Sequence, residues 1–331
     1  MSKLKGFTPT FWVANILELF ERLAYYGSKA ILTVYIAEKV GLGPERAGFL
    51  VGSVFNTLLY FLPALAGTFV DRYGFKRSLM ACFAIFCVGY FLIGLGGLPM
   101  GQPLVEALGP TTYMVLALVI TAIGGSLIKP CIVGTVARTT NDQTKGLGYS
   151  IYYTLVNFGG AIGPILALQV RENIGIAYVL VMSSLVSLAL LFGTLLFYRE
   201  PVSVGTGKTM GQVLRDMVMV FGNGRFVTFL IIFSGFWAMF WQIFYALPFY
   251  ARDVLGFEKF EIIETVDAWT IILVTIPAAA LAKRLSPLVA MTLGFGLATA
   301  SWFLMGAFQS LTVTVVAICV FALGEAIQAP R

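Results

Sequence analysis

Apolar residues fill ten long stretches of this chain, and short polar segments separate them. A run of about 20 mainly apolar residues is long enough to cross the hydrocarbon core of a bilayer as an α-helix. The pattern therefore predicts an all-α integral membrane protein with ten spans. These spans are expected over residues 10–37, 46–70, 76–97, 111–138, 145–170, 175–198, 226–251, 262–284, 287–307 and 311–331.

The longest polar segment, residues 200–223, divides the spans into six and four. Within it, residues 210–221 form a weakly amphipathic run that is suited to the inner membrane surface. We expect an N-terminal six-helix bundle over 1–198, a cytoplasmic connector over 199–225 and a partial C-terminal bundle over 226–331. Because four helices cannot mirror six, we expect a truncated second half. A genuine ten-span protein is the alternative.

Four charged residues and two adjacent tyrosines lie among the apolar residues of the first span. At 100° per residue they fall within about 140° of one face of a helix. A charge in the middle of a membrane costs several kcal/mol unless it faces a wet cavity or a partner. The pattern therefore indicates a transport pathway inside the protein. The six residues are Glu18, Glu21, Arg22, Tyr25, Tyr26 and Lys29.

The composition supports a membrane protein, and the distribution of lysines and arginines explains their excess over acidic residues. Charged residues make up only 11% of the chain and hydrophobic residues 59%, whereas soluble domains carry about 25% charged residues. With the predicted spans, thirteen lysines and arginines fall on one side of the membrane and five on the other. By the positive-inside rule, the N-terminus is cytoplasmic and the protein lies in the plasma (inner) membrane. The net charge of +6 is then a topology signal, and we expect no nucleic-acid partner.

Several classes of chemistry lack the residues that they need. The four cysteines have no metal-ligand spacing and lie in apolar stretches, and the chain has no histidine. No phosphate-binding loop or nucleophile triad is present, so we expect neither an enzyme nor direct use of ATP. We therefore expect no cofactor and no metal, and any proton chemistry must use buried carboxylates.

A motif between the second and third spans reads G-T-F-V-D-R-Y-G-F-K-R. Gly67 would permit close helix packing, Gly74 a tight turn, and Asp71 a contact with the positive N-terminus of a neighbouring helix. Such a contact would latch a cytoplasmic gate shut. An ordinary basic inner loop is the alternative. The expected gate residues here are Gly67, Asp71, Arg72, Gly74 and Arg77.

This motif resembles the signature of the major facilitator superfamily, whose members have two six-helix halves around a central cavity. Three further motifs narrow the resemblance. Glu18-Leu-Phe-Glu-Arg-Leu-Ala-Tyr-Tyr-Gly27, Lys129-Pro130 and Tyr152-Tyr-Thr-Leu-Val-Asn157-Phe-Gly resemble, in order, motifs of the proton-dependent oligopeptide transporters. The resemblance is strong over the first half and looser through Glu325. It implies a monomeric carrier of small peptides and protons in the lipid bilayer.

Proton coupling needs a buried carboxylate that can exist in either charge state beside a cation that responds. Glu18, Glu21 and Arg22 provide this within one helix, and one carboxylate should hold a proton more readily than the other. Lys129 lies about 13 Å from the inner end of its span, hence near the midplane. A purely structural ion pair between the first and fourth spans is the alternative.

The resemblance also implies where a peptide would bind. Arg22 and Lys129 would hold its carboxylate, and Glu325 would face its amino group. Hydrogen bonds to its backbone would come from Tyr26, Tyr60 and Asn157, and Trp237 would either shape the side-chain pocket or serve only in packing. Tyr25 lies beside these residues and could equally be a packing residue.

Three departures from the family pattern bear on substrate and gating. Trp241 stands where many members have a glutamate, and its usual arginine partner is here Lys29, so we expect the outer gate to close by aromatic packing. Asp267 stands near the position of an Asn-Pro pair. It could bind an amine or carry a proton, or it could be a helix-start acid near the outer surface.

The sequence thus predicts a proton-coupled symporter that imports di- and tripeptides by alternating access. Two alternatives remain at this point. The same fold could carry nitrate or another small anion, and such a carrier should tolerate loss of Glu325. A membrane nutrient sensor could bind ligand without transport, although it would not need the charges at Glu18, Glu21 and Lys129.

Overall fold

The computed structural model describes residues 6–201, 209–282 and 284–328, and these residues form helices and no strand. Nine long helices are α1 (Pro9–Val34), α5 (Phe75–Leu95), α7 (Pro110–Thr139), α8 (Lys145–Asn173), α9 (Ile176–Phe197), α11 (Gly224–Tyr245), α13 (Phe260–Ala282), α14 (Pro287–Ala307) and α15 (Leu311–Gln328). Within the described ranges, eight helical stretches are long and apolar enough to span a membrane. Part of the expected connector, residues 202–208, and the end of the expected last span, residues 329–331, lie outside the described residues.

The predicted second span is one stretch from Pro44 to Tyr73 but is built from four pieces. The pieces are α2 (Pro44–Gly48), the π-helix η3 (Phe49–Phe55), α3 (Asn56–Phe61) and α4 (Pro63–Tyr73). Pro63 interrupts the backbone ladder because its nitrogen has no hydrogen to donate. The sequence pattern predicted the span but not this division.

Short helices extend or link the spans. They are η2 (Tyr35–Lys39), η4 (Pro99–Gly101), α6 (Gln102–Leu108), α10 (Met210–Val220), α12 (Leu247–Phe249) and η5 (Tyr250–Val254). The amphipathic run in the connector does form a helix, α10. Thr209 caps it by accepting a hydrogen bond from the backbone nitrogen of Gln212, whose side chain in turn accepts from the nitrogen of Thr209.

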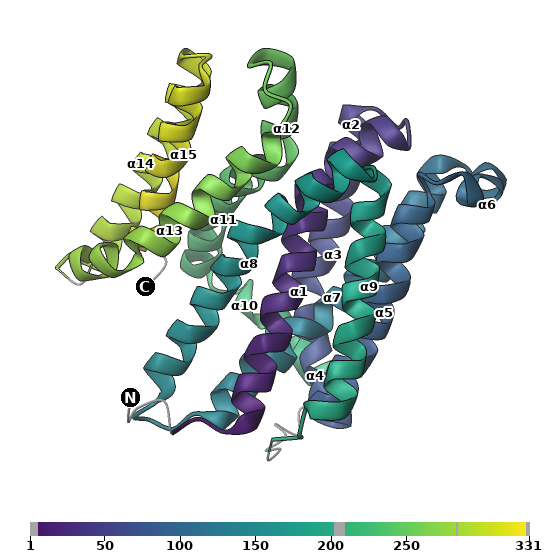
Figure 1. The fold of residues 1–331 in the computed structure, drawn as a ribbon. Coiled ribbons are helices and arrows are strands. Elements are labelled where there is room, and N and C mark those ends of the chain that lie inside the picture. The colour runs from purple at the N-terminus through teal and green to yellow at the C-terminus, as the bar shows by residue number, and fades with distance from the viewer. Residues whose placement is uncertain (1–5, 202–208, 283, 329–331) are drawn as a thin grey trace.

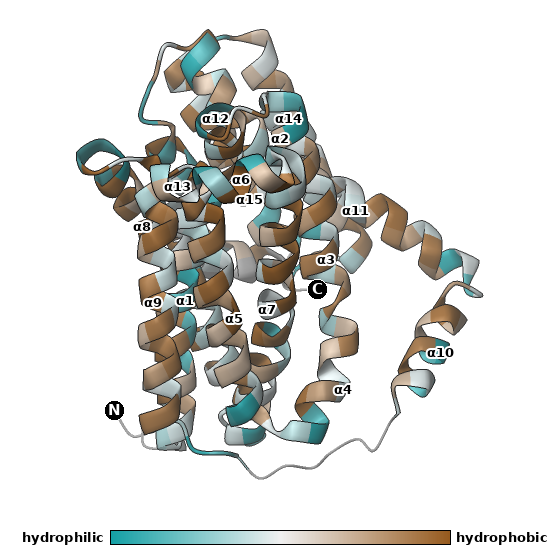
Figure 2. Cartoon of the chain, turned by 90° about the vertical axis from the view of Figure 1, so that its right-hand side faces the viewer, coloured by the Kyte–Doolittle hydropathy of each residue, from teal (hydrophilic) through white to brown (hydrophobic). Residues whose placement is uncertain are grey.

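The helices divide into two groups around a central region. In the first group α1 packs against α8 and α9, and α5 packs against α7 and α9; in the second, α13 and α14 pack against α15. Figure 1 shows these groups as the purple-to-teal and green-to-yellow helices, and α8 meets α13 between them. Apolar residues run along most of α5, α9 and α11, while hydrophilic residues gather near helix ends (Figure 2). The structure is therefore that of a multi-pass membrane protein with two groups of helices.

Glycines set how closely α1 and α8 approach. A Cβ atom added at Gly159 would lie 2.4 Å from Cβ of Arg22, and one added at Gly163 would lie 2.7 Å from the carbonyl oxygen of Leu23. Real Cβ atoms do not approach other atoms so closely, so only glycine fits at these positions. The close contact fixes the charged stretch of α1 against α8.

Candidate functional site

The charged stripe of α1 faces the protein interior. Glu18 is fully buried, and Glu21 and Arg22 are 2% and 7% exposed. On the opposite side of the helix Ile16 and Phe20 are about half exposed, as expected for an apolar back. The stripe therefore lies in protein, as the cost of a charge in lipid requires.

Four charged groups meet in one cluster between α1 and α7, which we call the central ion cluster: Glu18, Glu21, Arg22 and Lys129. Nζ of Lys129 lies 3.1 Å from Oε1 of Glu18, and Nε of Arg22 lies 3.6 Å from the same oxygen. Nε of Arg22 also donates to Oε2 of Glu21 at 2.5 Å. The four charges sum to zero when all are ionised, so each carboxylate has a cation within reach.

The central ion cluster retains capacity for further partners. Oε2 of Glu18 and Oε1 of Glu21 are buried and accept no hydrogen bond from the described residues. Lys129, in contrast, has a side chain that is 41% exposed. A proton can therefore reside on either carboxylate, and a ligand can reach the lysine.

Tyr152 belongs to this cluster, although the sequence analysis assigned it no role. Nζ of Lys129 donates to its hydroxyl oxygen at 2.6 Å and lies 5.1 Å from the ring centre. The fifth-span motif contains this tyrosine, so the motif itself was the available signal. Its partnership with Lys129 depends on how α7 and α8 pack.

Two acids from the other half face the same central region. Asp267 on α13 is 8% exposed, and Oδ1 of Asp267 and Oε2 of Glu325 on α15 are buried with no hydrogen-bond partner among the described residues. Tyr26 lies within electrostatic range of Arg22 on one side and of both acids on the other. Arg22 and Lys129 of the first half thus have carboxylate partners, whereas Asp267 and Glu325 of the second half have no described cation partner. We call these two acids the acidic wall.

The remaining predicted binding residues are only partly brought together. Tyr60 is 57% exposed and its ring contacts Trp241 at 5.7 Å between centroids. The amide nitrogen of Asn157 donates to the carbonyl of Tyr153 one turn earlier in α8. Trp237 contacts Phe236 and Phe240 of its own helix.

The aromatic residue that reaches the tyrosine of the first half is therefore Trp241. Trp237 was expected to shape the side-chain pocket or to serve only in packing, and this stays a prediction. One helical turn separates the two tryptophans on α11, and only the packing of α11 against η3 and α3 decides which one faces Tyr60.

Lys29 is 1% exposed and has no carboxylate partner among the described residues. Its Nζ donates to Oδ1 of Asn56 at 2.7 Å and to the hydroxyl of Tyr245 at 3.2 Å. The rings of Trp241 and Tyr245 each have their centre 4.9 Å from the same nitrogen. Cation–π contacts and neutral hydrogen bonds thus take the place of an ion pair, in line with the expected aromatic closure.

Among the described residues, three ion pairs join the two halves at the end opposite the N-terminus. Nε of Arg171 lies 2.5 Å from Oε1 of Glu261, and Nζ of Lys259 lies 3.2 Å from Oε1 of Glu172. Arg252 pairs with Glu38 through both of its terminal nitrogens. The hydrogen bond to Glu38 raises the pKa of Arg252 above its ordinary value. The sequence analysis identified none of these pairs, because each joins residues far apart in the chain.

In the gate motif, Gly74 does form the expected turn, with φ of +86° just before α5. The carboxylate that caps α5 is Glu200, not Asp71: its two oxygens each accept from a backbone nitrogen, of Phe75 and Lys76, at 2.7 Å. Asp71 Oδ1 instead lies 3.8 Å from an Arg138 nitrogen at the end of α7. The cap of α5 thus comes from the chain that returns after α9, and the expectation for Asp71 at a helix N-terminus stays a prediction.

The other gate residues have few described contacts. A Cβ added at Gly67 would meet nothing within 4 Å, so close packing at Gly67 is not used in the described structure. Arg72 stacks on its neighbour Tyr73, with 5.6 Å from Cζ to the ring centre. Arg77 lies in the first turn of α5.

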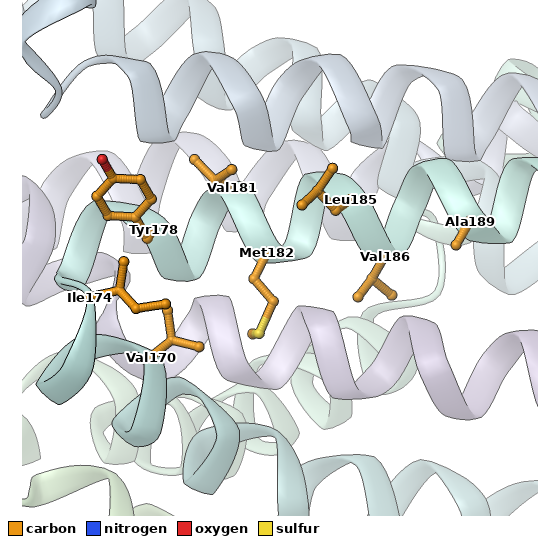
Figure 3. Close-up of a pocket in the computed structure, with 8 residues that line it drawn as sticks. All are labelled: Val170, Ile174, Tyr178, Val181, Met182, Leu185, Val186 and Ala189. Carbon is orange, nitrogen blue, oxygen red and sulfur yellow. The ribbon is translucent and has the colours of Figure 1, made fainter.

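An apolar groove on the outer surface is separate from this site. Residues of α8 and α9 line it, including Val170, Val181 and Leu185, together with Ile174 between the two helices (Figure 3). It holds no charged side chain, and its position on two spanning helices gives it the character of a lipid-facing surface. Among the described residues no group of histidine, cysteine and acidic side chains is arranged to hold a metal ion.

Comparison with known proteins places this geometry in context. A family profile described as Major Facilitator Superfamily matches residues 15–330. Dipeptide and tripeptide permease B of Aliivibrio fischeri is 28% identical over 186 residues, which is 55% of this chain and 35% of the permease. The match thus spans about a third of that relative's length.

Solved structures share the fold. A transporter of the POT family in complex with 5-aminolevulinic acid superposes with a TM-score of 0.76 at 18% identity, covering 97% of this chain and 82% of that one. A structure described in terms of substrate recognition in proton-dependent oligopeptide transporters gives a TM-score of 0.75 at 20% identity, covering 98% and 82%. At these identities the likeness is one of fold.

Proposed function

Since this chain belongs to the Major Facilitator Superfamily and is therefore a transporter rather than an enzyme, we propose that it is a proton-coupled symporter of di- and tripeptides. It would belong to the proton-dependent oligopeptide branch and work by alternating access. The halves would be residues 1–198 and 226–331, joined by a cytoplasmic connector over 199–225. The observation that carries the proposal is the difference between the halves: Arg22 and Lys129 lie in the central ion cluster of the first half, and the second half contributes the acidic wall without a described cation.

This arrangement suits a zwitterion. A peptide presents a carboxylate at one end and an ammonium group at the other, and each needs an opposite charge once it leaves water. Arg22 can bind a carboxylate through two nitrogens, and Lys129 can add a third donor. Asp267 and Glu325 offer acceptors to the ammonium group. A carrier for a simple anion has no use for these two acids, which disfavours that alternative.

Charge balance in the central ion cluster supports proton coupling. The cluster is neutral with two carboxylates and two cations. A peptide carboxylate that enters adds one negative charge in a region of low dielectric constant, where uncompensated charge is costly. Protonation of Glu18 or Glu21 restores neutrality and frees Lys129 or Arg22 to bind the peptide. Proton and peptide would therefore bind together and leave together.

The ion pairs at the end opposite the N-terminus bear on the transport cycle. With the N-terminus in the cytoplasm of an inner membrane protein, these pairs and the Lys29 contacts would close the outer side. The described state would then be inward-facing, which agrees with the exposure of Tyr60 and Lys129. Import would require these outer contacts to separate and re-form in each cycle.

The test is uptake of labelled dialanine by the purified 331-residue chain in proteoliposomes under an inward proton gradient. We expect accumulation in the wild type and its loss in Glu21→Gln, with peptide exchange across the membrane retained. Glu106→Gln, which changes an exposed acid of α6, serves as the matched control and should behave as the wild type. Absence of accumulation by a folded wild type would refute peptide import, and binding without uptake would favour a sensor.

A further inference from the structure

Three acidic side chains follow one another along α13: Glu261, Glu264 and Asp267. A spacing of three residues places successive side chains about 4.5 Å apart along the helix axis and within about 60° of each other around it. All three are buried, with exposures of 0%, 2% and 8%. We call this series the α13 acid file. It runs from the end that carries the three inter-half ion pairs to the central region.

The three acids differ in their partners. Glu261 is held by Arg171, whose Nε and a terminal nitrogen donate to its two oxygens at 2.5 and 3.1 Å. Both oxygens of Glu264 are buried and accept no hydrogen bond from the described residues. Oδ1 of Asp267 is in the same condition. In the α13 acid file, Glu261 is therefore in an ion pair, whereas Glu264 and Asp267 have no described hydrogen-bond partner at these oxygens.

No described cation compensates Glu264. The elements packed against α13 are α8, α15, α12 and α1. The ionisable groups on these elements include Arg171, Glu172 and Tyr153 from α8, Glu325 from α15, and Tyr26, Arg22 and Lys29 from α1. The helix α12 has none. The adjacent η5 adds Arg252 and Asp253, and the loop before α13 adds Glu258 and Lys259. Arg171 is occupied by Glu261, and the charged neighbour that acts on Glu264 is Glu261 itself.

An ionised carboxylate in such a place is costly, whereas a protonated one is neutral and is tolerated. A structural role would give Glu264 a hydrogen-bond partner, since buried polar groups in folded proteins are normally satisfied. The chain has placed an unpaired acid one helical turn from each of two other acids.

We propose that Glu264 is a proton carrier that links the outer end of the protein, at Glu261 and Arg171, to Asp267 and Glu325 in the central region. The inference rests on the proposed proton-coupled transport and adds a second proton route beside the central ion cluster. In each cycle the carboxylate of Glu264 takes up one proton from water at the outer end and becomes a neutral acid. It then gives that proton to the carboxylate of Asp267 and is itself returned to the ionised form.

The route explains how the acidic wall accepts an ammonium group. Asp267 and Glu325 together carry two negative charges when ionised, and a peptide ammonium compensates only one. A proton delivered along α13 compensates the other. The wall is then neutral with a peptide bound, as the central ion cluster is.

Two measurements test the proposal, with Glu264→Gln as the variant and Glu258→Gln as a matched control that changes an exposed acid six residues earlier. The first is dialanine uptake in proteoliposomes together with proton entry reported by a pH dye in the lumen. We expect Glu264→Gln to lose proton-driven accumulation while it retains peptide exchange, and Glu258→Gln to match the wild type. Unchanged accumulation and proton entry in Glu264→Gln would overturn the proposal. So would a peptide uptake that is driven by sodium instead of protons and depends on Glu264.

The second measurement is infrared spectroscopy of the carboxylic-acid C=O band as pH is varied, without any peptide. We expect the wild type and Glu258→Gln to show a component that Glu264→Gln lacks. Its absence from the wild type overturns the proposal whatever the transport result. If the wild type moves no dialanine but shows the component, peptide import fails, while reversible protonation of Glu264 is supported independently of it. Glu264→Asp keeps an acid at the position and should restore the band if Glu264→Gln does not fold.

Discussion

The ammonium nitrogen of Lys129 on α7 lies 3.1 Å from a carboxylate oxygen of Glu18 on α1, and the hydroxyl of Tyr152 on α8 binds the same nitrogen at 2.6 Å. One lysine thus joins three helices near the middle of the first half. Glu18 is fully buried whereas Lys129 is partly exposed, so the pair has one fixed member and one that a ligand can reach. This difference suits an ion pair that must open during a transport cycle.

Lys129→Gln should weaken the binding of peptide. It removes a hydrogen bond between charged groups, worth about 1.5–3 kcal/mol, which corresponds to roughly a tenfold to hundredfold change in binding. Dialanine affinity can be measured by isothermal titration in detergent. Lys129→Arg keeps the charge and should retain part of the affinity. Equal affinity in wild type and Lys129→Gln would contradict a role in substrate binding.

Gly159→Ala should destabilise the protein by about 1–3 kcal/mol, because the added Cβ overlaps the side chain of Arg22. Gly146→Ala is the matched control on the same helix, since a Cβ there meets nothing within 4 Å. Thermal unfolding of the two variants in detergent measures the difference. A melting temperature of Gly159→Ala equal to that of Gly146→Ala would show that α1 and α8 do not pack as closely as described.

The Arg171 and Glu261 pair should behave as a buried pair. Arg171→Leu leaves the fully buried Glu261 without a counterion and should cost about 3–5 kcal/mol, while the double variant with Glu261→Leu should recover most of that loss. A double-mutant cycle on thermal unfolding gives the coupling between them. Additive effects of the two single changes would argue that the pair does not hold α8 and α13 together.

The contribution of the Arg252 and Glu38 pair to stability should not change with pH near neutrality. The pKa of Arg252 is raised by Glu38, so this contribution to stability is fully present below the ordinary arginine pKa and is lost only in strong alkali. Because Glu38 is about half exposed, the contribution should be small, about 0.2–1 kcal/mol. The effect of Glu38→Gln on unfolding should therefore be the same at about pH 6 and about pH 8. A difference that grows between these values would contradict this account.

Much of the site was predictable because a charged side chain in a membrane-spanning helix is stable only where it faces the protein interior or water. Glu18, Glu21, Arg22 and Lys129 stand in long apolar stretches, and the energetic cost of ionised groups in lipid is enough to indicate an interior site for them. The central ion cluster places all four together, as expected. The turn at Gly74 and the aromatic surroundings of Lys29 also agree with their sequence-based expectations.

Other assignments depended on contacts that no local pattern contains. Trp237 and Trp241 are one turn apart on α11 and chemically identical, so only the packing of α11 decides which of them contacts Tyr60. Glu200 caps α5 because the chain returns from α9 to that point, and no local pattern predicted this contact. Glu264 carried no motif and was missed, and its lack of a partner is visible only when α8 and α15 are in place around it.

The sequence by itself determined that the chain forms long apolar helices and that charged side chains lie inside the protein, because hydrophobic length and the cost of burying charge act locally along the chain. The tertiary structure alone decided which charges pair, which acids remain unpaired and which end holds the two halves together. Those properties depend on distances of a few ångströms between helices that are far apart in the chain, and helix packing sets these distances.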